Sequence, residues 1–279
     1  MTGSKVTASA GENLSSLGAA ALWVLITSDA KKKAENSRTA ARLWQSGALE
    51  GAIENCPPDR PARPAAPQLL SPGQMPRRRK GGSVQTRIAL LHAVAHIELN
   101  AIDLAWDLVA RFGVGMPRDF LDDWVQVADD EARHFMMIAD RLTDLGAHYG
   151  DLPAHDGLWE ASQATAKDLG ARLAVVPMVL EARGLDVTPS MINRLKAMGD
   201  SQSADALSVI YADEVGHVAA GQKWFQWLCA RDGKDPQRHF QTQVTNYFRG
   251  ALKPPFNTEA RSKAGLPRDF YEPLAQKCP

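Results

Sequence analysis

Residues 127–138 read VADDEARHFMMI and residues 210–218 read IYADEVGHV, so the chain carries two copies of an Asp-Glu-x-x-His pattern. Residues three apart share a helix face, so each Glu-x-x-His places a carboxylate and an imidazole one turn apart. Glu98 and Glu181 each stand 33 residues before the glutamate of one pattern. One Glu from each of two helices plus Glu-x-x-His from each of two others is the ligand set of dinuclear carboxylate bundles.

Six residues are therefore the predicted metal ligands: Glu98, Glu131, His134, Glu181, Glu214 and His217. All four glutamates lie in apolar helical stretches, as with Leu91, Val94 and Ile102 around Glu98. A carboxylate buried without a partner costs several kcal/mol, so buried carboxylates are paired, protonated or metal-bound. Two divalent cations would neutralise all four, and two imidazoles would complete the ligand shell.

The spacing of 33 residues requires the chain to turn back between the two glutamates of each half. A continuous helix of that length would separate them by roughly 50 Å, too far for one site. Gly113 to Pro117 supplies a turn midway in the first half, and Gly199-Asp200 does so in the second. Hairpins at these points would bring each pair of glutamates to one level.

The apolar spacing is helical throughout and shows no sustained strand-like alternation, which predicts an all-α fold. We expect a four-helix bundle with an extra N-terminal helical region, a proline-rich linker and a C-terminal extension. Its helices are predicted near 84–112, 117–145, 158–184 and 201–231, with a short piece near 189–198 and a looser helical region over 13–48. The predicted parts are an N-terminal extension (1–56), a Pro/Arg-rich extended linker (57–83), the bundle (84–231) and a C-terminal extension packed on it (232–279).

Local signals refine these helix ends. Gly184 and Pro189 are expected to end or break the third helix soon after Glu181. Asp200 or Ser201 can cap the last long helix. The turn-rich residues 146–157 are predicted to form a crossover along the bundle.

Composition is typical of a globular protein rather than of a nucleic-acid-binding or membrane protein. The 279 residues are 44% apolar, and 32 basic residues balance 32 acidic ones. Zero net charge gives no global field toward nucleic acid or membrane. Three scattered cysteines favour a reducing cytoplasm over a disulfide framework. Residues 17–26 have the apolar character of a signal peptide but lack its basic start, so a helix is expected. No segment is expected to be long enough to span a bilayer.

Each Glu-x-x-His follows an aspartate, Asp130 or Asp213. Metal-bound histidines usually donate their second ring N–H to a carboxylate or carbonyl group. We therefore expect Asp213 to accept from His134, and Asp130 to accept from His217. The alternative interpretation is that both are solvated helix acids.

Other polar residues near the predicted ligands have simpler interpretations. Tyr211, one turn before Glu214, is either a tyrosine close to the metal or a core residue with a bonded hydroxyl. Arg183 either binds an anionic substrate or forms a structural ion pair. His92 and His96 are expected to be satisfied histidines rather than extra ligands, and Asp103 and Asp107 are expected to lie on the helix surface.

Several motifs together resemble a known family: HAVAHIELNAIDLAWD (92–107), DEARHF (130–135), YGDLPAHDGLWEA (149–161), VVPMVLEARGLD (175–186), DEVGHV (213–218) and PPFNTEARSKAGL (254–266). They are similar to the bacterial ferritin-like family named only as domain of unknown function 455. The resemblance covers nearly the whole chain and implies a ferritin-like bundle with a dinuclear metal centre. The order of ligands alone is also similar to that of di-iron hydroxylases, including the tRNA hydroxylase that acts on methylthio-isopentenyl adenosine.

The first functional hypothesis is an oxygen-dependent hydroxylase or oxidase of a small organic substrate. Imidazole and carboxylate ligands suit iron or manganese, so two iron ions are expected, with manganese or a mixed pair as alternatives. No further catalytic residue is predicted beyond the metal centre. An external reductase would supply electrons, because the sequence shows no glycine-rich nucleotide-binding motif.

Other hypotheses stay open. One is a ferroxidase or iron-storage protein; others are manganese-based peroxide disproportionation and a non-enzymatic partner protein with a vestigial centre. A tRNA substrate would need phosphate contacts, for which the basic stretch 60–80 is a candidate, although zero net charge argues against it. A homodimer is expected only by analogy with other helical-bundle enzymes.

Overall fold

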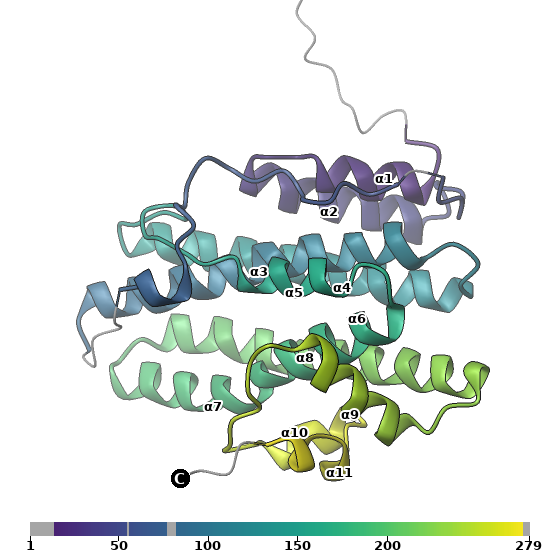
Figure 1. Cartoon of the computed structure of the whole chain (residues 1–279). Coiled ribbons are helices and arrows are strands. Elements are labelled where there is room, and N and C mark those ends of the chain that lie inside the picture. Colours follow the sequence, from purple (N-terminus) through teal and green to yellow (C-terminus); the bar gives the residue numbers. More distant parts are fainter. Residues whose placement is uncertain (1–13, 55, 77–81, 276–279) are drawn as a thin grey trace, which may run out of the picture. The chain divides into compact units, whose positions relative to one another are not determined.

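The computed structural model describes residues 14–54, 56–76 and 82–275 (Figure 1). These residues form helices and isolated bridges but no strand, so the all-α prediction is confirmed. The α-helices are α1 (Leu17–Leu25), α2 (Ala30–Gln45), α3 (Val84–Phe112), α4 (Arg118–Asp144), α5 (Gly157–Ala164), α6 (Leu169–Val175), α7 (Ala182–Ala197), α8 (Ser201–Asp232), α9 (Pro236–Tyr247), α10 (Thr258–Lys263) and α11 (Arg268–Tyr271). A π-helix (Val176–Glu181) joins α6 to α7, and 3₁₀ turns occupy Pro72–Gln74 and Glu272–Leu274.

The chain divides into two compact units. Unit 1 comprises Met1–Pro64 and Ala101–Arg133, and unit 2 comprises Ala65–Asn100 and His134–Pro279. The boundary crosses α3 and α4, so each of these helices is shared between the units. The predicted division into N-terminal extension, linker, bundle and C-terminal extension stays a prediction.

In unit 1, α1 and α2 lie side by side and pack on the shared helices (Figure 1). The buried face of α2 repeats every three to four residues, as an amphipathic helix requires, through Lys33, Ala34, Ser37, Ala40, Ala41 and Trp44. Ser37 donates from Oγ to the carbonyl of Ala128 at 2.9 Å, and Trp106 donates from Nε1 to Ser37 Oγ at 2.7 Å. These bonds satisfy polar groups inside an apolar interface, where an unpaired group would be costly.

A buried ion cluster also holds unit 1 together. Lys33 Nζ pairs with Asp103 and donates to the carbonyls of Ala62 and Leu25, and Arg63 Nε lies 2.9 Å from the other Asp103 oxygen. Burial lowers the pKa of Lys33, against the opposing effect of Asp103. The expectation that Asp103 and Asp107 are surface acids is wrong, because both are fully buried. Asp107 is bound by Arg111 at 2.8 Å, one turn further along α3.

In unit 2, α7 and α8 run side by side on either side of the turn at Gly199 (Figure 1). Asp200 caps α8 by accepting from the Ser203 N–H at 3.1 Å, as predicted. The same carboxylate pairs with Arg87 of α3 and Arg141 of α4, at 3.0 and 3.1 Å. One buried aspartate thus ties three helices together within unit 2.

The predicted third helix differs most from the structure. The range 158–184 contains α5, α6 and the π-helix instead of one continuous helix, and α7 runs through Gly184 and Pro189 to Ala197. A proline inside a helix loses a hydrogen bond and crowds the preceding turn. The buried face of α7, which includes Leu185, Ile192 and Leu195, packs along α8 and offsets this cost.

The C-terminal residues pack on the helices of unit 2. Asn257 donates from Nδ2 to the Tyr211 hydroxyl at 2.9 Å, and Arg261 binds the buried carboxylate of Asp186 at 2.7 Å. Phe240 of α9 packs edge-on against Phe225 of α8 at 6.1 Å between ring centroids.

Helix α3 is apolar and long enough to cross a membrane by length and composition alone, so the expectation that no such segment exists is wrong. Of its most apolar stretch, 72% is buried inside the structure. That burial is characteristic of a core helix, and Glu98, Asp103 and Asp107 all lie on it.

Candidate metal centre

Helices of unit 2 carry a cluster of carboxylates and imidazoles. Glu98 lies on α3, His134 on α4, and Glu214 and His217 one turn apart on α8. All four side chains are buried. Glu131 is also buried and precedes His134 by one turn on the uninterrupted helix α4.

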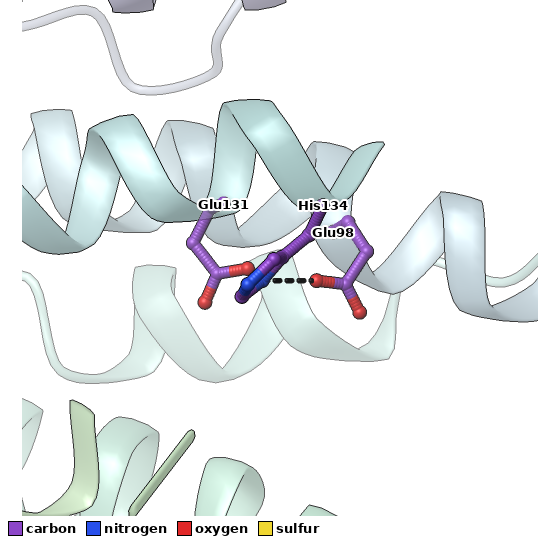
Figure 2. Close-up of side chains that lie close together, drawn as sticks. All are labelled: Glu98, Glu131 and His134. Atoms are coloured by element: carbon purple, nitrogen blue, oxygen red, sulfur yellow. Dashed lines mark ion pairs between the residues drawn. The ribbon is translucent and has the colours of Figure 1, made fainter. Parts of the chain in front are cut away.

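The ligand atoms of these residues converge in two groups. Glu98, Glu131 and His134 offer one atom each within 4.8 Å of one another, and Glu131, Glu214 and His217 do the same (Figure 2 shows the first group). Glu131 belongs to both groups. Glu181, at the end of the π-helix, is in neither group and is half-buried.

His134 has a carboxylate at each ring nitrogen. Its Nδ1 lies 3.2 Å from Glu98 Oε2, and its Nε2 lies 3.0 Å from Asp213 Oδ2 (Figure 2 shows the contact with Glu98). The contact with Asp213 has the geometry that the sequence predicts. If Nε2 donates its hydrogen to Asp213, Nδ1 keeps the lone pair with which imidazole binds a metal.

The second imidazole lies beside the first. The ring centroids of His134 and His217 are 5.9 Å apart, and His217 Nδ1 is 3.9 Å from Glu214 Oε2. Asp130 is bound by Arg133 at 3.0 Å and accepts from Gln126 at 3.2 Å. Its expected bond with His217 stays a prediction.

The separations fit the chemistry of a shared cation. Two ligand atoms at about 2.1 Å from one ion lie about 3 Å apart when the angle between them is a right angle. Glu98 Oε2 and His134 Nδ1 are 3.2 Å apart. The carboxylates of Glu98 and Glu131, with ligand atoms within 4.8 Å of one another, also repel each other, and a positive ion between them would offset this repulsion.

Packing beside the π-helix depends on Gly221 of α8. A Cβ atom there would lie 2.5 Å from Pro177 Cβ, closer than real contacts allow. The missing side chain therefore lets the π-helix that ends at Glu181 approach α8. π-Helices often occur at functional sites, and sequence reasoning missed this one, although Pro177 inside the helix is the signal that marks it.

Two candidates resemble structural groups more than catalytic ones. The Tyr211 hydroxyl accepts from Asn257, which matches a core tyrosine with a bonded hydroxyl. Arg183 donates to the carbonyl of Lys253 at 2.7 Å and lies 3.4 Å from Asp186. Both residues hold the C-terminal segment in place.

Two further histidines of α3 are hydrogen-bonded in the core, as expected. His96 contacts the Tyr149 hydroxyl at 2.9 Å and the carbonyl of His155 at 3.1 Å. His92 accepts from the Gly150 N–H at 2.9 Å. Neither belongs to the two groups of ligand atoms.

Comparison with known proteins places this helical chain with its carboxylate and imidazole cluster in a family. Residues 26–272 match the family described as "Protein of unknown function (DUF455)", and the chain belongs to that family. It is 40% identical over 225 residues to a protein of Haemophilus influenzae (strain ATCC 51907 / DSM 11121 / KW20 / Rd) printed as "Uncharacterized protein", covering 78% of each chain. No solved structure matches.

Proposed function

We propose that the chain is a ferritin-like protein whose Glu98, Glu131, His134, Glu181, Glu214 and His217 hold two iron ions, and that it is an oxygen-activating hydroxylase or oxidase of a small organic substrate. Manganese or a mixed pair is the alternative metal content. The observation that carries the proposal is the position of the His134 ring between Glu98 and Asp213. A metal-bound imidazole held by a second carboxylate would need such a position, which supports the proposal.

The chain's own groups would prepare this site before any reaction. Asp213 would accept the Nε2 hydrogen of His134 and so fix the ring with the Nδ1 lone pair toward Glu98. Buried side chains such as Phe135 and Ile138 on the same turns of α4 exclude bulk water. Exclusion of water strengthens every electrostatic interaction in the site.

Two iron ions with these ligands supply the capacity to bind and reduce dioxygen and to oxidise a C–H bond, a C=C bond or an amine. The glutamates would balance the positive charge of the ions, and each histidine would anchor one ion. Electrons would come from an external reductase.

The basic run from Arg77 to Lys80, part of the stretch considered for tRNA, lies outside the described residues.

The test is oxygen uptake by the purified full chain loaded with iron, supplied with an electron-donating reductase and a panel of small organic compounds. We expect uptake that needs the iron, the reductant and one compound, with oxygen from labelled dioxygen found in an oxidised product. Glu98→Gln should abolish the uptake. Glu259→Gln removes a carboxylate from the exposed face of α10 and should leave it unchanged.

Oxidation of iron without an organic substrate, with many irons retained per chain, would identify a ferroxidase instead. Absence of substrate-dependent uptake across the panel in an iron-loaded chain would contradict the hydroxylase and oxidase proposal.

A further inference from the structure

A cavity of 490 Å³ lies beside the first turns of α3 in unit 2. Its walls come from one face of α3, from the segment before that helix and from the loop after α4; the lining includes Met75, Thr86, Ala89, His92, Ala93 and Leu152. This volume falls in the range of small-molecule sites, roughly 300–1,000 Å³. No lysine or arginine is among its described lining residues.

His92 is the buried polar side chain of this lining, with only 2% of its surface exposed. Its Nε2 accepts from the backbone N–H of Gly150 at 2.9 Å and lies 3.4 Å from that of Leu152. Burial lowers the pKa of His92, against a smaller opposing effect of Asp151. A neutral imidazole that accepts at Nε2 carries its hydrogen on Nδ1.

The Nδ1–H group of His92 has no acceptor among the residues that the structure describes. One face of the ring stacks on Tyr149, with 5.4 Å between centroids, and the Nε2 edge is bound by the loop. The remaining edge of the His92 ring, which carries Nδ1, is the one that can face the cavity. An acceptor in the cavity that receives this hydrogen would be bound favourably.

We propose that this cavity binds a small, mainly apolar organic molecule whose single oxygen acceptor receives the Nδ1–H of His92. The described lining residues offer mainly apolar surface. His92 precedes Glu98 by six residues, which is about 9 Å along a helix. We expect this binding to occur with or without iron in the metal centre.

The experiment compares two probes of nearly equal shape, acetophenone and α-methylstyrene, which differ in a carbonyl oxygen against a methylene group. Isothermal titration calorimetry on the full chain measures both affinities, with and without iron. We expect acetophenone to bind about 3- to 10-fold more tightly, as one hydrogen bond provides. Equal affinities for the two probes, or no binding of either, would overturn the proposal.

Variants locate the probe. Ala89→Phe fills the cavity and should abolish binding of both probes, whereas Ala197→Phe, exposed at the end of α7, should leave both affinities unchanged. His92→Gln keeps an amide oxygen for the Gly150 N–H and removes the Nδ1–H, so acetophenone should lose its advantage while α-methylstyrene still binds. Binding that survives Ala89→Phe, or that requires iron, would contradict the proposal.

Discussion

Two of the three buried carboxylates on helix α3, Glu98 and Asp103, lie five residues apart, and their surroundings differ in kind. Asp103 in unit 1 is paired with two basic side chains, Lys33 and Arg63. Glu98 in unit 2 lies against an imidazole, His134, which is itself held by Asp213. The charge of Asp103 is balanced within a structural ion cluster. The groups around Glu98 are all of types that bind metals. This difference distinguishes a structural buried charge from a candidate functional one.

The largest expected effect on stability comes from removing one basic side chain from the buried ion cluster of unit 1. Lys33→Met leaves the fully buried Asp103 without one of its two cations. Removing one partner of a buried pair costs about 3–5 kcal/mol. Urea denaturation should show this loss in the free energy of unfolding.

The triple variant Lys33→Met/Arg63→Met/Asp103→Leu should recover much of the stability, because apolar replacement of a whole buried ion cluster is often close to neutral. An unchanged stability in Lys33→Met alone would show that the ion cluster is not what holds unit 1 together.

Asp200 extends the comparison to a buried carboxylate of unit 2 that is neutralised by arginines. Burial raises its pKa, but the hydrogen bonds from Ser203 and Arg87 and the charge of Arg141 outweigh this, and the net pKa is lowered. Asp200→Asn should lower the free energy of unfolding at neutral pH by about 1.5–3 kcal/mol.

The sign of the pH dependence follows from the lowered pKa. The stabilisation that ionised Asp200 contributes is fully present above the pKa of an unfolded aspartate, about 3.9. It is lost as the pH falls through the pKa of Asp200 in the folded chain. The difference between the wild type and Asp200→Asn should therefore shrink in unfolding curves recorded toward pH 3. A stability difference that grows as the pH falls would contradict the lowered pKa of Asp200.

Asp213→Asn tests the carboxylate that contacts the His134 imidazole. The variant keeps the size of the side chain but weakens the hydrogen bond that it accepts from the His134 Nε2–H. Loss of such a support typically costs 10–100-fold in metal affinity. A competition titration with a coloured chelator measures this, and Asp144→Asn, an exposed change on α4, is the control. Equal affinities in the two variants would contradict the role of Asp213.

The smallest effect concerns two glycines of α8. Gly216→Ala meets no atom within 4 Å and should stabilise the chain by about 1 kcal/mol through helix propensity. Gly221→Ala gains the same propensity but forces its Cβ into Pro177, and overpacking of this kind costs about 1–3 kcal/mol. Thermal unfolding should shift in opposite directions, and equal shifts would show that the π-helix does not depend on Gly221.

The sequence predicted local elements better than irregular ones. Helix α3 matches its predicted range because Gly113 and Pro117 end its apolar repeat sharply. The continuation of α7 through Gly184 and Pro189 was not predicted, because both residues favour a break, whereas packing against α8 sustains the helix. Glu98 and His134 were identified by their repeated spacing. Asp103 was misjudged because its partner Lys33 is 70 residues away in the chain and no local pattern links them.

The metal content of the purified full chain tests the central claim most directly. After reconstitution with ferrous iron and removal of loose metal, elemental analysis should find two ions per chain in the wild type and in Glu259→Gln. Glu98→Gln, which loses one ligand charge, should retain one ion or none. A wild-type chain that retains no metal, or a Glu98→Gln chain that still holds two ions, would contradict the account.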